Sequence, residues 1–185
     1  MGVELDEPVR AAAAAIAESL RNRLGSRIDA RWIPAANLHI TLWFLGEVTD
    51  ERADALLRTI GLPFEEKPFD IHVAGLGAFP SSGAPRVIWI GVPSGAAALI
   101  RLHGELAIRL RPFGIEPERR GYSAHLTVAR VRDVPGGDRD GHVRGAFRAT
   151  PAVAGQSRVT AVTVFRSRLS PKGASYEPLL RVPLQ

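Results

Sequence analysis

The feature that most constrains this chain is a histidine-x-threonine triplet that occurs twice. His39 and Thr41 stand in "NLHITLWFLG", and His125 and Thr127 stand in "SAHLTVAR". Both triplets interrupt apolar, β-branched runs of the kind that form strands. Because side chains alternate along a strand, residues two apart point to the same face. Each triplet therefore predicts a strand that presents one imidazole and one hydroxyl together.

An internal duplication relates the two triplets. They lie 86 positions apart, close to half of the 185 residues. The same offset pairs three further positions: Leu42 with Val128, Glu47 with Asp133, and Val48 with Val134. With only five histidines in the chain, a second triplet at the matching place is improbable by chance. The duplication predicts two lobes related by a rough twofold, with both triplets facing one cleft.

The remaining pattern predicts three helices and several strands. Helices are expected over 7–24 after Asp6 as cap, 50–60 before Gly61, and 95–110 after Ser94 as cap. Strands are expected over 37–46, 124–131, 158–169 and 176–182, with a hairpin from 69–79 and 86–92 and a charged loop over 134–145. This order predicts an α+β architecture, and the even composition predicts a single domain over 1–185.

Composition narrows the class of protein. The chain is 45% hydrophobic, has no run of membrane-spanning length and no apolar leader, and is expected to be soluble and cytoplasmic. It contains no cysteine, which excludes a disulfide framework and a thiolate zinc site. Its 24 basic residues are 22 Arg and two Lys, for a net charge of +5. Arginine suits phosphate recognition, but a coding bias toward arginine explains the count equally well, so the charge permits a nucleic-acid partner without requiring one.

The paired triplets predict a specific chemistry. Two imidazoles that face one phosphate form a complete acid–base pair, because one removes a proton from water while the other protonates the leaving oxygen. The threonine hydroxyls would donate to the non-bridging oxygens, where charge builds up in the transition state. This scheme needs no metal and no other cofactor, and His72, His103 and His142 show no metal-binding spacing.

These residues resemble the two-histidine (2H) phosphoesterases, and among them the RNA 2′,3′-cyclic phosphodiesterases, also called 2′-5′ RNA ligases. The similarity takes in "HITLWFLGEV", "HLTVARV", "RWIPAANLH", "RVIWIGV" and "SRLSPKGASYEPLLRVPL", spread over nearly the whole chain. It implies a bilobal 2H phosphoesterase fold, with two pseudo-twofold-related lobes of antiparallel strands, outer helices and a central cleft. It also implies hydrolysis of RNA 2′,3′-cyclic phosphate ends to 2′-phosphate, and ATP-independent 2′-5′ RNA joining as the reverse transesterification.

The resemblance also implies roles for individual residues. His39 would be the general acid to the 3′ oxygen and His125 the base for water, although a near-symmetric site can run either way. Phe44 and Arg130 each lie five residues beyond their histidine. Strict alternation points both away from the cleft and buries Phe44 in its strand, whereas the resemblance suggests that they frame the nucleobase. Of the short apolar strand with which the family begins, only "VEL" remains, so either the start is late or one lobe edge is short.

The expected partners are RNA ends or nucleoside cyclic phosphates, without a membrane, and the protein is expected to act as a monomer. Two alternatives stay open. The same enzyme class would fit a small cyclic phosphate or a 2′-5′ oligoadenylate as substrate. A different class, an RNA-end binding module, would have lost turnover, and the intact residues of both triplets speak against it.

Overall fold

The computed structural model describes residues 1–117, 121–138, 141–170 and 173–185. Within these ranges the helices are α1 (Glu7–Leu24), α2 (Asp50–Ile60), α3 (Ala96–Leu110) and α4 (His142–Ala149). The strands are β1 (Gly2–Glu4), β2 (Asp29–Trp32), β3 (His39–Thr41), β4 (Phe69–Ala74), β5 (Leu76–Phe79), β6 (Val87–Gly91), β7 (His125–Asp133), β8 (Val153–Val159), β9 (Ala161–Ser170) and β10 (Gly173–Pro183). Single 3₁₀ turns cover Gly25–Arg27, Ala35–Asn37 and Arg111–Phe113.

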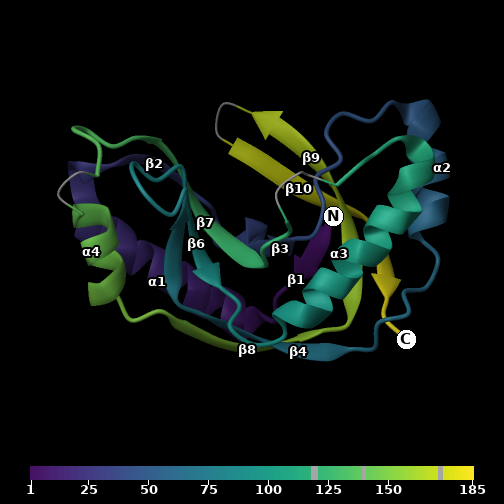
Figure 1. The fold of residues 1–185 in the computed structure, drawn as a ribbon, viewed down its shortest axis with the longest axis horizontal. Coiled ribbons are helices and arrows are strands. Elements are labelled where there is room, and N and C mark those ends of the chain that lie inside the picture. Colours follow the sequence, from purple (N-terminus) through teal and green to yellow (C-terminus); the bar gives the residue numbers. More distant parts are fainter. Residues whose placement is uncertain (118–120, 139–140, 171–172) are drawn as a thin grey trace.

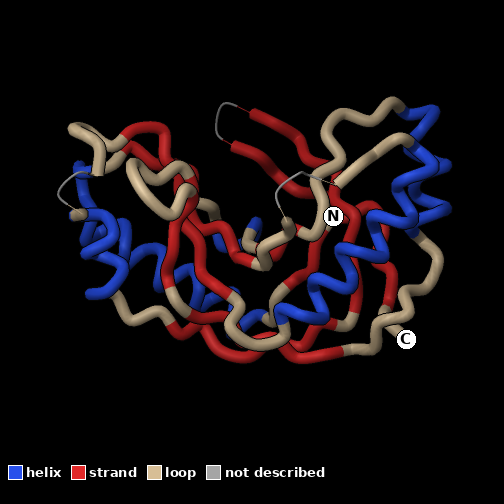
Figure 2. Tube along the Cα trace, in the orientation of Figure 1, coloured by secondary structure: helices blue, strands red, loops and turns tan. Residues whose placement is uncertain are grey.

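One large antiparallel sheet runs through the middle of the molecule. Its strand order is β10-β9-β1-β3-β7-β6-β5, and β2 pairs with β7 beyond the end of β3. Strands β4 and β8 form a separate two-stranded ribbon along the bottom of the view in Figure 1. Helices α1 and α4 lie on one side of the sheet's centre and α2 and α3 on the other, as Figure 2 shows in blue. The predicted α+β, two-lobed fold class is confirmed.

The order of elements repeats along the chain. Apart from β2, which is inserted between α1 and β3, and β10 at the end, the series β1-α1-β3-α2-β4-β5 is followed by β6-α3-β7-α4-β8-β9. Equivalent strands pair with each other, β3 with β7 and β4 with β8, both antiparallel, as a twofold axis between them requires. The halves also exchange strands, because β9 pairs with β1 and β5 pairs with β6. Each lobe is therefore built from both halves of the sequence.

The long helices form where the apolar spacing predicts them. Helix α1 buries positions three or four apart, among them Val9, Ala13, Leu20 and Leu24, and α3 does the same with four leucines. Gly25 ends α1 as predicted.

Both expected helix caps act differently from the prediction. Asp6 occupies the N-cap position of α1, but its carboxylate accepts a hydrogen bond from the Arg158 backbone N–H at 2.7 Å. The predicted Ser94 cap is wrong: Gly95, with φ of 83°, is the N-cap of α3. A Cβ at Gly95 would meet the Asp70 carbonyl oxygen at 2.4 Å, so this turn requires glycine. The Ser94 carbonyl instead accepts from the His72 N–H.

Three predicted strands are shorter than expected. Strand β3 stops at Thr41, because the N–H groups of Leu42 and Trp43 both donate to the Met1 carbonyl. Two N–H groups that share one acceptor do not continue the regular pairing between strands. The segment 69–79 breaks at Gly75, with φ of 81°, so that β4 pairs with β8 and only β5 forms the hairpin with β6. The segment 158–169 breaks at Thr160 between β8 and β9. The residues "VEL" contribute to β1, which lies inside the sheet between β3 and β9.

The expected loop over 134–145 contains the start of α4, and residues 139–140 within it lie outside the described residues. The Asp138 carboxylate accepts from the Val143 N–H at 2.9 Å and from the Arg144 guanidinium at 2.7 Å. This anchor holds the first turn of a helix that a glycine-rich, charged sequence does not predict. No helix in the described ranges is long and apolar enough to cross a membrane.

Candidate active site

The two triplets meet at the centre of the sheet. Ile40 of β3 pairs with Leu126 of β7, and both side chains are fully buried. The flanking residues of each triplet therefore leave the sheet on the opposite face. Continuing the antiparallel register by one residue places His39 opposite Thr127 and His125 opposite Thr41. The two histidines occupy one diagonal of this square, and diagonal neighbours in an antiparallel pair are typically about 7–8 Å apart, which leaves room for a small group between the two rings.

A backbone carbonyl orients each imidazole in the same way. Nδ1 of His39 lies 2.9 Å from the Asn37 carbonyl oxygen, and Nδ1 of His125 lies 2.7 Å from that of Ser123. A carbonyl only accepts hydrogen bonds, so both Nδ1 atoms must carry a proton. Nε2 is therefore the nitrogen that each ring has available for proton transfer. In the resting arrangement the Thr41 hydroxyl lies 3.2 Å from Nε2 of His39 and donates to it when the ring is neutral.

Burial makes both imidazoles less basic than usual. Desolvation lowers the pKa of His39, and the hydrogen bond to Asn37 only partly offsets it. Desolvation likewise lowers the pKa of His125, although the hydrogen bond to the Ser123 carbonyl acts in the opposite direction. The positive charge of Arg130 adds to the lowering in both cases. Both rings are thus mainly neutral at pH 7.

An aromatic pair contacts each histidine, and the two pairs repeat. The His39 ring lies 5.1 Å from Phe165 and 4.9 Å from Tyr176, centroid to centroid. The His125 ring lies 5.1 Å from Phe79 and 6.4 Å from Trp89. Phe79 and Phe165 are 86 positions apart, and Trp89 and Tyr176 are 87 apart. Sequence reasoning missed these rings, although the offset of the triplets extended to the β5–β6 and β9–β10 hairpins would have found them.

A β-bulge turns Arg130 toward the site. The β6–β7 register shifts between Ile88 and Trp89, so the consecutive residues Val128 and Ala129 both point into the core. The extra residue resets the alternation and places Arg130 on the face of His125 and Thr127. The prediction from strict alternation is therefore wrong for Arg130.

Phe44 lies outside the sheet, in the segment after β3, with its side chain 78% exposed. The prediction that it is buried in a strand is wrong, because β3 ends three residues earlier. Among the described residues Phe44 makes no ring contact with either histidine, and its role beside a nucleobase stays a prediction.

Trp43 packs in the core, where it stacks on His103, and His103 stacks on Tyr122. The Tyr122 hydroxyl donates to the Thr41 carbonyl at 3.1 Å, which fixes the end of β3.

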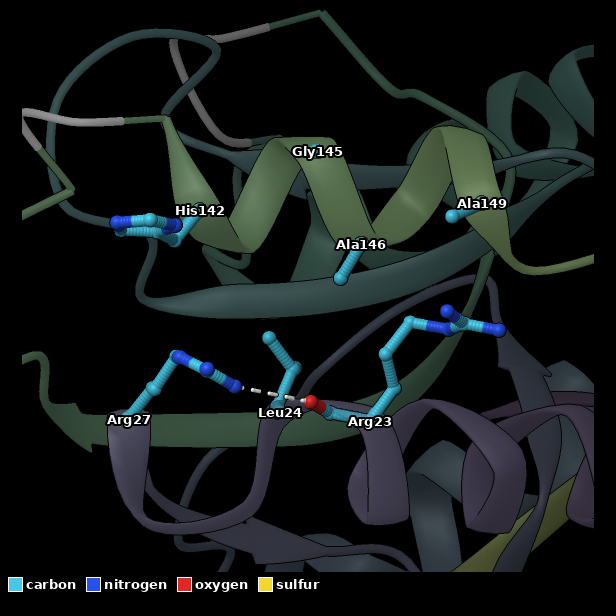
Figure 3. Close-up of a pocket in the computed structure, with 7 residues that line it drawn as sticks. All are labelled: Arg23, Leu24, Arg27, His142, Gly145, Ala146 and Ala149. Carbon is cyan, nitrogen blue, oxygen red and sulfur yellow. Dashed lines mark hydrogen bonds between the residues drawn. The ribbon is translucent and has the colours of Figure 1, made fainter.

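A shallow depression lies away from this site, between the end of α1 and α4 (Figure 3). Arg23, Arg27 and His142 stand at its rim, and Arg27 donates to the Arg23 carbonyl. None of the triplet residues lines it.

Within the part of the chain that the structure describes, no group of three or more His, Asp or Glu side chains is arranged to hold a metal ion. The absence of a metal or cofactor requirement stays a prediction.

A bilobal α+β fold with two His-x-Thr triplets facing one another defines the class of two-histidine phosphoesterases. The pattern of the LigT like phosphoesterase family matches residues 3–89 and again residues 90–176. This chain therefore belongs to that family, and the two matches correspond to the internal duplication.

Known proteins agree with this assignment. An RNA 2′,3′-cyclic phosphodiesterase of Archaeoglobus fulgidus is 32% identical over 181 residues, 97% of this chain and 96% of the relative. One of the same description from Aquifex aeolicus is 34% identical over 119 residues, but that alignment spans only 63% of each protein. The solved structure of TT0787 from Thermus thermophilus superposes with a TM-score of 0.78 and 27% identity, covering 99% of this chain and 95% of that one.

Proposed function

We propose that this protein hydrolyses RNA 2′,3′-cyclic phosphate ends to 2′-phosphates. The observation that carries the proposal is the pair of imidazoles on one diagonal of the β3–β7 pairing, each with its proton fixed on Nδ1 by a carbonyl. Such a pair presents two Nε2 atoms to opposite sides of one phosphorus, which in-line attack requires. The activity described for the Archaeoglobus relative supports the choice of substrate.

In this mechanism Nε2 of His125 takes a proton from water as the water oxygen bonds to phosphorus. The bond from phosphorus to the 3′ oxygen breaks, and Nε2–H of His39 protonates that oxygen, which leaves a 2′-phosphate. The bound anion raises the pKa of His39 from its lowered value, so the acid gains its proton when substrate arrives. Thr41 and Thr127 donate to the non-bridging oxygens. If a 5′-OH takes the place of water, the same step joins RNA ends: the 5′ oxygen bonds to phosphorus, the bond to the 3′ oxygen breaks, and a 2′-5′ linkage forms without ATP.

The test is hydrolysis of a nucleoside 2′,3′-cyclic phosphate and of a cyclic-phosphate-ended oligonucleotide in EDTA. The expected product is the 2′-phosphate alone. His39→Ala and His125→Ala should each lower kcat by about 10²–10⁴, the usual contribution of one general acid or base. His72→Ala, on β4 and outside the triplets, is the matched control and should retain full turnover.

Four results would count against the proposal. Dependence on an added metal, or full activity without His39 or His125, would contradict the mechanism. Turnover of only a small cyclic phosphate or of a 2′-5′ oligoadenylate would change the substrate. RNA-end binding without any turnover would make the protein a binding module.

A further inference from the structure

Two arginines face each other across neighbouring strands beside the site. Arg31 of β2 pairs directly with Arg130 of β7. The residues on either side of this pair pack toward the core: Ala30, Trp32, Ala129 and Val131. Arg31 therefore leaves the sheet on the same face as Arg130. Like charges directly opposite one another destabilise an antiparallel pair, so the sheet bears a cost at this position.

Neither guanidinium has an acidic partner among the described residues. Farther along the same two strands, Arg132 of β7 lies 3.7 Å from the carboxylate of Asp29 on β2. An acidic residue thus balances the charge of that arginine. A terminal nitrogen of Arg31 is buried, and no atom of the described residues accepts a hydrogen bond from it. A buried guanidinium N–H without an acceptor is unfavourable, and an anionic oxygen would satisfy it.

The pair lies next to the place of the reacting phosphate. Beyond the effect of burial, the positive charge of Arg130 lowers the pKa of both His39 and His125, so its guanidinium is within electrostatic reach of both rings. Arg31 stands one strand further out on the same face. The positive charge thus continues from the reacting phosphate toward β2.

We propose that Arg31, with Arg130, binds a second phosphate of the substrate, the one attached to the 5′ oxygen of the terminal nucleotide. Two adjacent guanidinium forks match the oxygens of one phosphate, and their mutual repulsion is relieved when it binds. The inference rests on the proposed function and refines its substrate. The preferred substrate is an RNA end that carries a 5′-side phosphate, rather than a free nucleoside cyclic phosphate.

The test compares a nucleoside 2′,3′-cyclic phosphate with the same compound carrying a 5′-phosphate. Wild-type kcat/KM should favour the 5′-phosphorylated compound by about tenfold, the effect of one charge-assisted hydrogen bond, and added salt should reduce this preference. Arg31→Gln should bring the ratio close to one, and Arg31→Lys should keep part of it. Arg132→Gln removes the same charge from the neighbouring ladder position and should leave the ratio unchanged.

Binding of the products decides the inference independently of turnover. The wild type should bind a nucleoside 2′,5′-bisphosphate about tenfold more tightly than the 2′-monophosphate, and Arg31→Gln should abolish the difference. Equal binding of the two by the wild type would overturn the inference while leaving the proposed function intact. So would an Arg132→Gln variant that loses as much preference as Arg31→Gln. Absence of wild-type turnover with the binding difference preserved would overturn the proposed function alone.

Discussion

Each histidine combines a fixed tautomer with a lowered basicity. The carbonyls of Asn37 and Ser123 keep Nε2 facing the site, while burial makes the cationic form unfavourable. The first arrangement selects the reacting nitrogen, and the second keeps the base neutral and ready to accept a proton at neutral pH. In the proposed mechanism, an acid becomes available when the substrate phosphate favours the cationic ring. In the resting site both imidazoles therefore favour the neutral form, which is the form that a general base requires.

The pH dependence should reflect this state. Because both pKa values lie below the ordinary imidazole value of about 6.5, the kcat/KM profile, which reports the free enzyme, should be bell-shaped with its maximum below pH 6.5. The kcat profile should lie at higher pH, because the bound anion favours protonated rings. Initial rates from pH 5 to 9 measure both profiles. Arg130→Gln removes a charge that lowers the pKa of both histidines. Both limbs of the kcat/KM profile should therefore shift to higher pH. A kcat/KM maximum above neutrality in the wild type would contradict burial as the dominant influence.

At this scale the sequence predicts that the two triplets meet, but it does not predict the direction of every side chain beside them. The triplets could be recognised because residue type and spacing both repeat. The direction of Arg130 could not, because a period of two assumes a regular strand and the bulge at Val128 and Ala129 adds one residue. The exposure of Phe44 followed from the early end of β3, which depends on two hydrogen bonds to the distant Met1 carbonyl, from the N–H groups of Leu42 and Trp43.

The two aromatic hairpins are equivalent elements that serve different histidines. Phe165 on β9 contacts His39, and Phe79 on β5 contacts His125. Phe165→Leu should let water approach His39 and raise its pKa toward the ordinary value, while the pKa of His125 stays unchanged. Phe79→Leu should do the reverse. NMR titration of the imidazole ring signals measures both, and each variant is the control for the other. Equal shifts at the two rings would show that the hairpins do not act locally.

The Trp89 indole on β6 covers Gly77 on the neighbouring strand β5. Gly77 pairs with Trp89, and a Cβ at Gly77 would lie 2.1 Å from the indole ring. Gly77→Ala should therefore cost about 1–3 kcal/mol of unfolding free energy through overpacking. A Cβ at Gly104, on α3, would meet nothing within 4 Å, so Gly104→Ala should stabilise by about 0.5–1 kcal/mol. Urea unfolding of both variants measures the two effects, and an unaffected Gly77→Ala protein would disprove the tight contact.

Elements follow from the sequence where local pattern decides them. The spacing of leucines and alanines gives α1 and α3 within a residue or two of the structure. The element boundaries at Gly75 and Gly95 were not predicted. Both glycines have a positive φ, which is set by the surrounding structure and not by the local sequence. Helix α4 was missed because Asp138, outside the helix, supplies the bonds that start it.

At the scale of the whole molecule, the duplication predicts the twofold arrangement but not the exchange of strands. Local pattern predicts the hairpin that joins β5 to β6, but it carries no information on which half supplies the partner of β1. The structure pairs β1 with β9 and β6 with β5, and it packs α1 against β7, β8 and α4 of the second half. The apolar face of α1 is therefore buried only when both halves are present.

This arrangement predicts that neither half folds alone. Cutting between the exposed residues Pro93 and Ser94 separates the triplets and removes from each fragment the strands that complete its sheet. Fragments 1–93 and 94–185 should each lack cooperative unfolding and turnover, because α1 and the edges of β1 and β6 would expose apolar surface and unpaired backbone groups. Mixing them should restore a cooperative transition and cyclic phosphate hydrolysis, measured by circular dichroism and by product formation. The control is the intact chain carried through the same denaturation and refolding. A fragment that unfolds cooperatively by itself would show two independent domains, against the single domain expected from composition.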